Sequence, residues 1–313
     1  MSILTVTLNP CIDKTITVDG FNYGGLNRVV DTREDAGGKG INVAKVLKTF
    51  DEPCVAYAMI GGQNGKRLAQ CLENENIDAI YTNAEGEVRT NQKIVNIKDG
   101  ITTEINEKGF TVSCKDFESA VEKIENLICS CDVVVLAGSI PNGVDEDVYA
   151  KLIKFANAHN TRVILDADAN KLKYGIGEKP YAIKPNLFEF EELIGKKMSN
   201  PAQIAVQAKK LIDSGLGLVV VSMGADGAVF TDGVDAFWAK PFDIECKSTV
   251  GAGDSMVALM AYSLCRGYDL ETLAKLCVCA GSITSSKEGT MVCTSSEVVG
   301  AKDKVTIWKI DTN

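Results

Sequence analysis

The stretch TVGAGDSMVALMAYSL, residues 249–264, places a carboxylate directly after three small residues. Apolar residues recur at helical spacing from Met256 onward, so residues 251–253 are predicted to form the turn that opens a helix, with Asp254 in its first turn. Backbone amides at a helix start have no partner inside the helix and carry the positive end of its dipole, so they attract anions. Glycine has no Cβ and lets a ligand approach this backbone closely.

Two explanations of Asp254 compete. A capping carboxylate is common in a first turn and contributes about 0.3–1 kcal/mol, but it does not account for the glycines. A carboxylate beside amides that hold a phosphoryl group can instead take the proton from an attacking hydroxyl. We therefore interpret Asp254 as the general base of a phosphoryl transfer, with the backbone of Gly251, Ala252 and Gly253 as its anion hole.

A second glycine-rich helix start, DAGGKGINVAKVLKTF, covers residues 35–50 and carries a cation and an amide. Basic and amide side chains also alternate along residues 89–93, where i, i+2 spacing puts them on one face of a strand. Arginine offers bidentate hydrogen bonds and lysine a point charge, so together these side chains suit a phosphomonoester. The set comprises Gly38, Lys39 and Asn42, with Arg28, Arg89, Asn91 and Lys93.

The elements that must position these residues alternate along the chain. Apolar β-branched runs at 3–9, 54–61, 132–141, 162–168, 181–186 and 218–224 are predicted to be buried strands. Helical patterns separate them at 65–77, 116–128, 145–159 and 200–215. Such alternation predicts a mostly parallel sheet with helices on both faces. Ligands of an open parallel sheet bind beyond the carboxyl ends of its strands, where Asp13, Ser139, Asp166, Asn186, Glu189, Ser222 and Gly224 follow predicted strands.

Two stretches, 11–33 and 86–111, alternate polar and apolar residues and are predicted to be exposed antiparallel strands of a small lid. The main domain would then comprise residues 1–10, 34–85 and 112–313. Exposed strand edges favour pairing with another chain, so we expect a homodimer through the lids.

Composition excludes several classes of function. The net charge of −9 argues against nucleic acid or an anionic membrane as a partner. No apolar run reaches the roughly 18–20 residues of a membrane span, and the N-terminus lacks the features of a leader, which predicts a cytoplasmic protein. The single histidine, His159, is expected at a surface helix end and rules out Ser-His-Asp catalysis and His-based zinc sites. The eleven cysteines predict free thiols, and the pairs Cys129/Cys131 and Cys277/Cys279 are expected to be buried.

Neither a P-loop nor a dinucleotide-binding fingerprint occurs in the sequence. The motifs TLNPCID, GGKGINVA, VRTNQK, LAGSIP, KPNLFE, VVVSMG and STVGAGDS, in this order over nearly the whole chain, resemble those of the PfkB carbohydrate kinases of the ribokinase-like fold. Within that family the chain looks most like the bacterial 1-phosphofructokinases and the tagatose-6-phosphate kinases. The resemblance implies a three-layer α/β/α domain with a β-sheet lid and ATP-dependent transfer to a sugar-phosphate hydroxyl.

The resemblance also implies roles for individual residues. Asp254 is the base and residues 251–253 the anion hole. Asp13, Gly38 and Asn42 match positions that bind sugar hydroxyls, and Arg28, Lys39, Arg89 and Lys93 match the region that holds the substrate phosphate. Asn91 and Ser139 are also predicted to bind the substrate. Lys184, Asn186, Ser222, Gly224, Gly227 and Gly253 match the ATP side, and Glu189 matches the position that organises Mg²⁺ through water.

Three positions depart from the family pattern. The chain reads ADAN after Asp166, where relatives have a Ser-Gly pair, Phe110 replaces a common proline, and Val88 stands where threonine is frequent. The expected reaction converts fructose 1-phosphate and ATP to fructose 1,6-bisphosphate and ADP. The alternatives are a tagatose-6-phosphate kinase, a non-catalytic sugar-phosphate sensor on the same fold, and a nicotinamide-dependent oxidoreductase, which the missing fingerprint disfavours.

Overall fold

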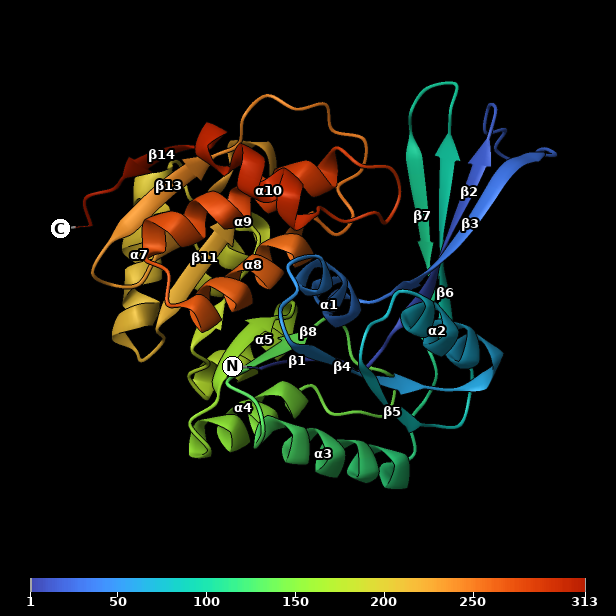
Figure 1. Ribbon diagram of the computed structural model, residues 1–313, viewed down its shortest axis with the longest axis horizontal. Coiled ribbons are helices and arrows are strands. Elements are labelled where there is room, and N and C mark those ends of the chain that lie inside the picture. Colours follow the sequence, from blue (N-terminus) through green and yellow to red (C-terminus); the bar gives the residue numbers. More distant parts are fainter. Residues whose placement is uncertain (1, 313) are drawn as a thin grey trace.

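The computed structural model describes residues 2–312 and contains a large layered domain with a smaller sheet projecting from one side (Figure 1). The large sheet has ten strands in these residues. In spatial order they are β14 (Thr306–Lys309), β13 (Ala236–Lys240), β12 (Ala228–Thr231), β11 (Leu218–Ser222), β10 (Ala182–Ile183), β9 (Arg162–Asp166), β8 (Val133–Ala137), β1 (Ile3–Thr7), β4 (Cys54–Ile60) and β5 (Ala79–Asn83). The strands from β11 to β5 pair in parallel, whereas β12, β13 and β14 form an antiparallel edge that the apolar runs did not predict.

Helices cover both faces of this sheet, as expected for an α/β fold. One face carries α1 (Lys39–Thr49), α8 (Ala252–Arg266), α9 (Leu270–Ser285) and α10 (Ser295–Ala301). The other face carries α2 (Gly62–Asn74), α3 (Cys114–Ile128), α4 (Val148–Ala158), α5 (Ala169–Gly177), α6 (Leu187–Ile194) and α7 (Pro201–Asp213). Side chains alternate across each strand, so Val133 and Val135 pack under the first group of helices while Val134 and Leu136 pack under the second. The predicted three-layer fold is confirmed.

The small sheet contains β3 (Val29–Gly37), β2 (Cys11–Val18), β6 (Arg89–Asn96) and β7 (Thr102–Asn106), in this spatial order. Its outer pairs are antiparallel, but β2 and β6 pair in parallel. The expectation of a purely antiparallel lid is therefore wrong. Both stretches leave the same rim of the large sheet and run outward together, so the two inner strands point the same way (Figure 1).

The cysteines are free thiols, but not all are buried. Cys277 and Cys279 lie inside α9 and are buried, as predicted. The prediction is wrong for Cys129, which is exposed, and Cys131 is only partly buried, because α3 ends at Ile128 and the chain turns at the surface before β8. His159 lies exposed at the end of α4, as predicted. No helix among residues 2–312 is long and apolar enough to span a membrane.

Candidate active site

The two glycine-rich helix starts, α1 and α8, face each other at one rim of the large sheet. Gly251 is the N-cap of α8 and has a left-handed backbone with φ of 76°, and Asp254 lies in the first turn as predicted. Among residues 2–312, no amide of α8 donates a hydrogen bond to the Asp254 side chain. Its Oδ2 accepts a hydrogen bond of 2.7 Å from Nδ2 of Asn42 in the first turn of α1. This carboxylate in the first turn of α8 is therefore hydrogen-bonded to the neighbouring helix.

The environment of Asp254 keeps its carboxyl basic. Only 7% of the residue is exposed, and burial, followed by the nearby negative charge of Asp166, raises its pKa to about 6. Lys39, Asn42 and Lys184 act in the opposite direction. A carboxylate whose pKa lies close to neutral pH is a much better proton acceptor than an ordinary aspartate.

Asp166 at the end of β9 lies between two lysines. Its Oδ1 is 3.1 Å from Nζ of Lys39 and 3.7 Å from Nζ of Lys184, and the side chain is 2% exposed. Burial alone would raise the pKa of Asp166, but Lys184 and Lys39 outweigh it, so the pKa is lowered. Burial likewise opposes the charge of Lys39, yet Asp166 and Asp254 raise its pKa. The cluster therefore contains two cations and two carboxylates, located where β9 and β10 end and where α1 and α8 begin.

The backbone of the predicted anion hole is open. In the described part of the chain, no hydrogen bond uses the amides of Gly253 or Asp254. A Cβ at Gly253 would lie 3.3 Å from Nζ of Lys184, so only a glycine leaves this lysine its present position beside the backbone. Unpaired amides next to an ammonium group are suited to hold a phosphoryl group.

The inner face of the small sheet adds polar groups to the same region. Asp13 and Lys93 form an ion pair of 3.2 Å in which each side chain is 6% exposed. Asn91 lies opposite Asp13 in the parallel register and donates from Nδ2 to Sγ of Cys11 at 3.2 Å. Buried oxygens of Asn42, Asn91 and Thr15 have no hydrogen-bond partner in the part of the chain that the structure describes. Buried polar atoms are nearly always satisfied, so these oxygens are places for the hydroxyls of a ligand.

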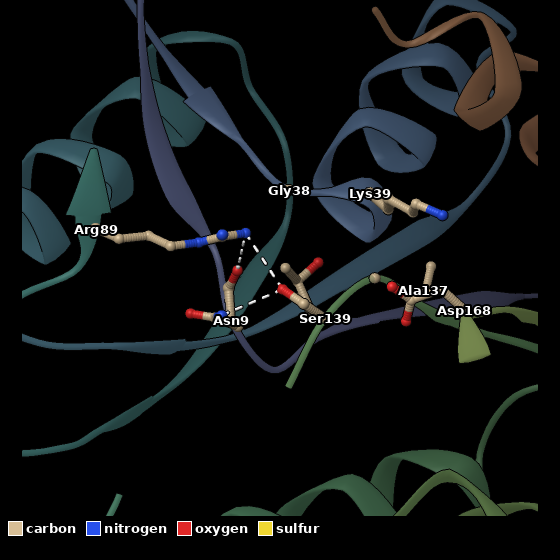
Figure 2. A pocket seen from close by; sticks show the side chains of 9 residues that line it. Asn9, Gly38, Lys39, Arg89, Ala137, Ser139 and Asp168 are labelled. Atoms are coloured by element: carbon tan, nitrogen blue, oxygen red, sulfur yellow. Dashed lines mark hydrogen bonds between the residues drawn. The ribbon is translucent and has the colours of Figure 1, made fainter. Parts of the chain in front are cut away.

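A cavity of about 200 Å³ lies where the small sheet meets the rim (Figure 2). Arg89 reaches across it from β6, with Nη2 3.2 Å from the carbonyl of Asn9 and 3.3 Å from Oγ of Ser139. Lys39 lies on the far side of the cavity, at the start of α1, with Gly38. The cavity thus combines an arginine, a lysine, a hydroxyl and a helix start, which is the chemistry of a phosphate site.

The residues predicted for the nucleotide lie farther along the rim. Asn186 and Glu189 form a capping box at the start of α6, in which each side chain accepts from the other's backbone at 2.8–2.9 Å. An isolated bridge connects Asn186 to Ser222 at the end of β11. Gly224 and Gly227, with φ of 60° and 83°, bracket the short turn that follows.

Some residues of the site were not predicted, and one predicted residue lies apart from it. Thr7, Asn9 and Asp168 line the cavity without having been singled out, although Asn9 belongs to the LNPCID motif that signalled this turn. Arg28 lies on the exposed turn between β2 and β3 and has no ion-pair partner among residues 2–312. The structure brings the other predicted sugar-side residues together around α1 and the base of the small sheet.

The chain resembles known proteins over most of its length. The sequence model described as pfkB family carbohydrate kinase matches residues 6–297. A 1-phosphofructokinase of Bacillus subtilis is 36% identical over 286 residues, covering 91% of this chain and 93% of that protein. A 1-phosphofructokinase of Borreliella burgdorferi is 34% identical over 286 residues, covering 91% and 92%.

Solved structures of phosphofructokinases resemble this chain over nearly its whole length. A putative phosphofructokinase from Staphylococcus aureus has a TM-score of 0.86 at 32% identity, covering 99% of this chain and 100% of that one. Phosphofructokinase-2 of Escherichia coli, solved with substrates and products, has a TM-score of 0.92 at 26% identity, covering 97% and 99%. Another structure of that protein is of a tetrameric inhibited form.

Proposed function

Because the chain belongs to the pfkB family of carbohydrate kinases, we propose that it transfers the γ-phosphoryl group of ATP to the 6-hydroxyl of fructose 1-phosphate. The observation that carries this proposal is the hydrogen bond between Asn42 and Asp254, which joins the starts of α1 and α8 around one buried carboxylate. The identity of 34–36% to two 1-phosphofructokinases over nine-tenths of the chain supports fructose 1-phosphate as the substrate.

Each part of the site then has a task. Asp254 accepts the proton of the 6-hydroxyl as its oxygen attacks the γ-phosphorus, and the Asn42 amide holds that carboxylate in place. The open amides of Gly253 and Asp254 stabilise the negative charge of the transferring group. Arg89 with Ser139 and Lys39 suits the phosphate of the sugar, and Asp13 with Asn91 suits its hydroxyls. Lys184, Asn186, Ser222, Gly224 and Gly227 form the ATP side.

The carboxylates at the rim fit a Mg²⁺ ion that keeps most of its waters. Both lysines contact Oδ1 of Asp166, and the capping box uses Oε2 of Glu189, so one oxygen of each carboxylate has no partner in the described residues. Mg²⁺ is usually held by one or two carboxylates together with substrate phosphates. When bound, it would neutralise charge on the phosphates of ATP. Asp166 and Glu189 would hold it, largely through water.

We further propose that the small sheet, residues 11–33 and 86–111, is a lid that excludes water from the reaction, since an open site would hydrolyse ATP. The rest of the chain would form the main domain. Hydrogen bonds already link the two: Nη2 of Arg89, on β6, donates to Oγ of Ser139 at 3.3 Å. Just outside these lid ranges, Oγ1 of Thr290, in the loop after α9, donates to Oδ2 of Asp35 on β3 at 2.6 Å. We place the protein in the cytoplasm, in keeping with its free cysteines.

The substrate is tested with the purified protein and Mg-ATP in a coupled assay of ADP release. We expect the highest kcat/KM with fructose 1-phosphate, compared with fructose 6-phosphate and tagatose 6-phosphate in the same enzyme batch. A higher value with tagatose 6-phosphate would assign the protein to that kinase instead. No ADP release with any sugar phosphate would favour a non-catalytic sensor.

The pH dependence of turnover follows from the raised pKa of Asp254. The base must be ionised to accept a proton, so kcat should be constant above about pH 7 and fall tenfold per unit below a pKa of about 6. An ordinary aspartate would give a limb near its usual pKa of 3.8. A pH profile of kcat at saturating substrates, measured between about pH 5 and 8, distinguishes a base with a raised pKa from an ordinary aspartate. A flat profile would count against Asp254 as the base.

We propose a homodimer through the lids. Large apolar side chains on the small sheet and its loops are exposed, among them Leu26 at 74%, Val30 at 61% and Ile105 at 52%, and the edge strands β3 and β7 have no partner on their outer sides among residues 2–312. We expect Val30→Asp combined with Ile105→Asp to give a monomer in analytical ultracentrifugation. Val234→Asp, at an 86% exposed residue on the large domain, is the matched control. An unchanged oligomer in the double variant would contradict the proposal.

A further inference from the structure

A chain of buried hydroxyl groups lies directly behind the predicted anion hole. Oγ of Ser255, on α8, donates to the carbonyl of Gly251 at 2.9 Å and lies 2.7 Å from Oγ1 of Thr284 on α9. The backbone amide of Cys293 donates to the same Thr284 oxygen at 3.0 Å. Ser255 is 0% exposed and Thr284 1% exposed. Three hydrogen bonds therefore connect the loop after α9 to the residue that opens α8.

The number of available protons fixes the direction of this chain. A hydroxyl has one proton, and Ser255 gives its proton to Gly251, so Thr284 must be the donor in the bond between the two hydroxyls. Thr284 in turn accepts from Cys293. All three bonds thus run in the same direction and end on the Gly251 carbonyl. Aligned hydrogen bonds in a buried environment polarise and strengthen one another.

The Gly251 carbonyl belongs to the same planar peptide unit as the amide of Ala252. It accepts two hydrogen bonds, one from the Ser255 hydroxyl and one of 2.8 Å from the Ser255 backbone amide. These bonds fix the plane of the peptide and draw electron density toward its oxygen, which makes the amide on the other side a better donor. The Ala252 amide itself makes only a long contact of 3.4 Å to the carbonyl of Thr249. The Ala252 amide can therefore exchange this contact for a hydrogen bond to an incoming phosphoryl oxygen.

Other buried hydroxyls of these two helices do not bridge them. Oγ of Ser263, also on α8 and fully buried, has no hydrogen-bond partner among residues 2–312, and Oγ of Ser282 on α9 donates to its own helix at Val278. Close packing brings the helices together at the bridging pair, since a Cβ on Gly281 of α9 would lie 3.3 Å from the Ala252 carbonyl. The position of the bridge at the first turn of α8 links it to the anion hole rather than to helix packing in general.

We propose that Thr284 is a positioning residue for phosphoryl transfer: through Ser255 it holds and polarises the Gly251–Ala252 peptide so that its amide binds the transferring group. This inference rests on the proposed function of the site. Thr284 touches neither substrate nor reacting atom in this scheme. Its effect should appear in the transition state, where the charge on the transferring group is largest, and not in the binding of either substrate.

The test compares Thr284→Val, which keeps the shape but loses the hydroxyl, with Thr284→Ser, which keeps the hydroxyl. Loss of a whole oxyanion-type donor costs about 10²–10³ in kcat; here the amide remains but is misaligned, so we expect a loss of about 10-fold in Thr284→Val. KM for both substrates and the acid limb of the pH profile should stay at wild-type values. Thr284→Ser should retain nearly full kcat, and so should Ser263→Ala, the matched control on α8.

Two further measurements separate positioning from packing. The affinity of ADP with tetrafluoroaluminate, in the presence of fructose 1-phosphate, should fall by the same factor as kcat in Thr284→Val, because the fluoride complex mimics the transferring group. Ser255→Ala should reproduce the loss of kcat. The kcat of the double variant should be no lower than that of the less active single variant, since both residues act in one chain of hydrogen bonds. Ser255→Ala also carries the test if Thr284→Val does not fold.

Wild-type kcat in folded Thr284→Val would overturn the inference. An equal loss in Thr284→Ser would overturn it as well, because the missing methyl group would then be the cause. These outcomes are distinct from failure of the proposed function, in which the wild-type protein itself would release no ADP with any sugar phosphate.

Discussion

Asp254→Asn should lose about 10²–10⁴ of the wild-type kcat, the usual contribution of a positioned general base. The asparagine has nearly the same shape and can still hydrogen-bond to Asn42, but it cannot accept the proton of the sugar hydroxyl. The affinity for ATP, measured by calorimetry, should change little. Near wild-type turnover in this variant would remove Asp254 from the mechanism.

The same substitution should make the protein more stable. The pKa of Asp254 in the folded protein, about 6, lies above its usual 3.8, so the folded state binds the proton more tightly and loses stability as pH rises between these values. At neutral pH this cost is on the order of 3 kcal/mol, which an uncharged asparagine does not incur. We therefore expect a higher Tm for Asp254→Asn at pH 7.5, and a smaller difference as the pH is lowered toward 5.

Asp269 provides a control in which removing the carboxylate should lower the stability of the protein. It is the N-cap of α9, where its carboxylate accepts from the amide of Thr272 at 2.8 Å, and this bond lowers its pKa. Asp269→Ala should cost about 1 kcal/mol of stability, as the loss of an N-cap usually does, and leave kcat unchanged. A lower Tm in Asp254→Asn as well would show that burial does not make that carboxylate costly.

Asp13→Ala should have the second large effect, on both stability and substrate binding. It leaves the ammonium group of Lys93 buried without its partner, which typically costs about 3–5 kcal/mol. It also removes the carboxylate that we propose accepts from sugar hydroxyls, so kcat/KM for fructose 1-phosphate should fall at least about 10-fold. Urea unfolding and steady-state kinetics measure the two effects.

Two further variants separate these effects. In Asp13→Ala combined with Lys93→Met an apolar pair replaces the ion pair, so stability should largely return while kcat/KM stays low. Lys14 is the next residue on β2, and its pair with Glu34 is about one-third exposed on each side. Lys14→Ala should therefore cost only about 0–1 kcal/mol and leave kcat/KM unchanged. Recovery of kcat/KM in the double variant would mean that Asp13 supports the lid without binding sugar.

Local sequence was sufficient wherever the chemistry belongs to a single element. The helix that opens at residues 251–253 and the position of Asp254 in its first turn follow from glycine conformation and the apolar repeat that begins at Met256. The alternation of Arg89, Asn91 and Lys93 on one face of a strand was predicted in the same way, and all three contact residues of the site or its base. The parallel core of the large sheet follows from the alternation of apolar runs and helical patterns.

Strand pairing was less predictable, because it depends on partners distant in the sequence. The parallel pairing of β2 with β6 joins segments about 80 residues apart, and nothing in either stretch distinguishes it from an antiparallel pair. The edge strands β12, β13 and β14 are four or five residues long, too short for a clear periodicity. The exposure of Cys129 likewise depends on where α3 ends against its neighbours.

The sequence by itself therefore determined the family and the fold class and supplied the candidate residues for phosphoryl transfer, because these follow from local patterns and ordered motifs. Only the tertiary structure decided which of those residues act together. Asn42 and Asp254 are 212 positions apart, and Lys39 and Asp166 are 127 apart. Their contacts, and the raised pKa of Asp254 that results from burial beside Asp166, arise only when the sheet brings its strand ends to one rim.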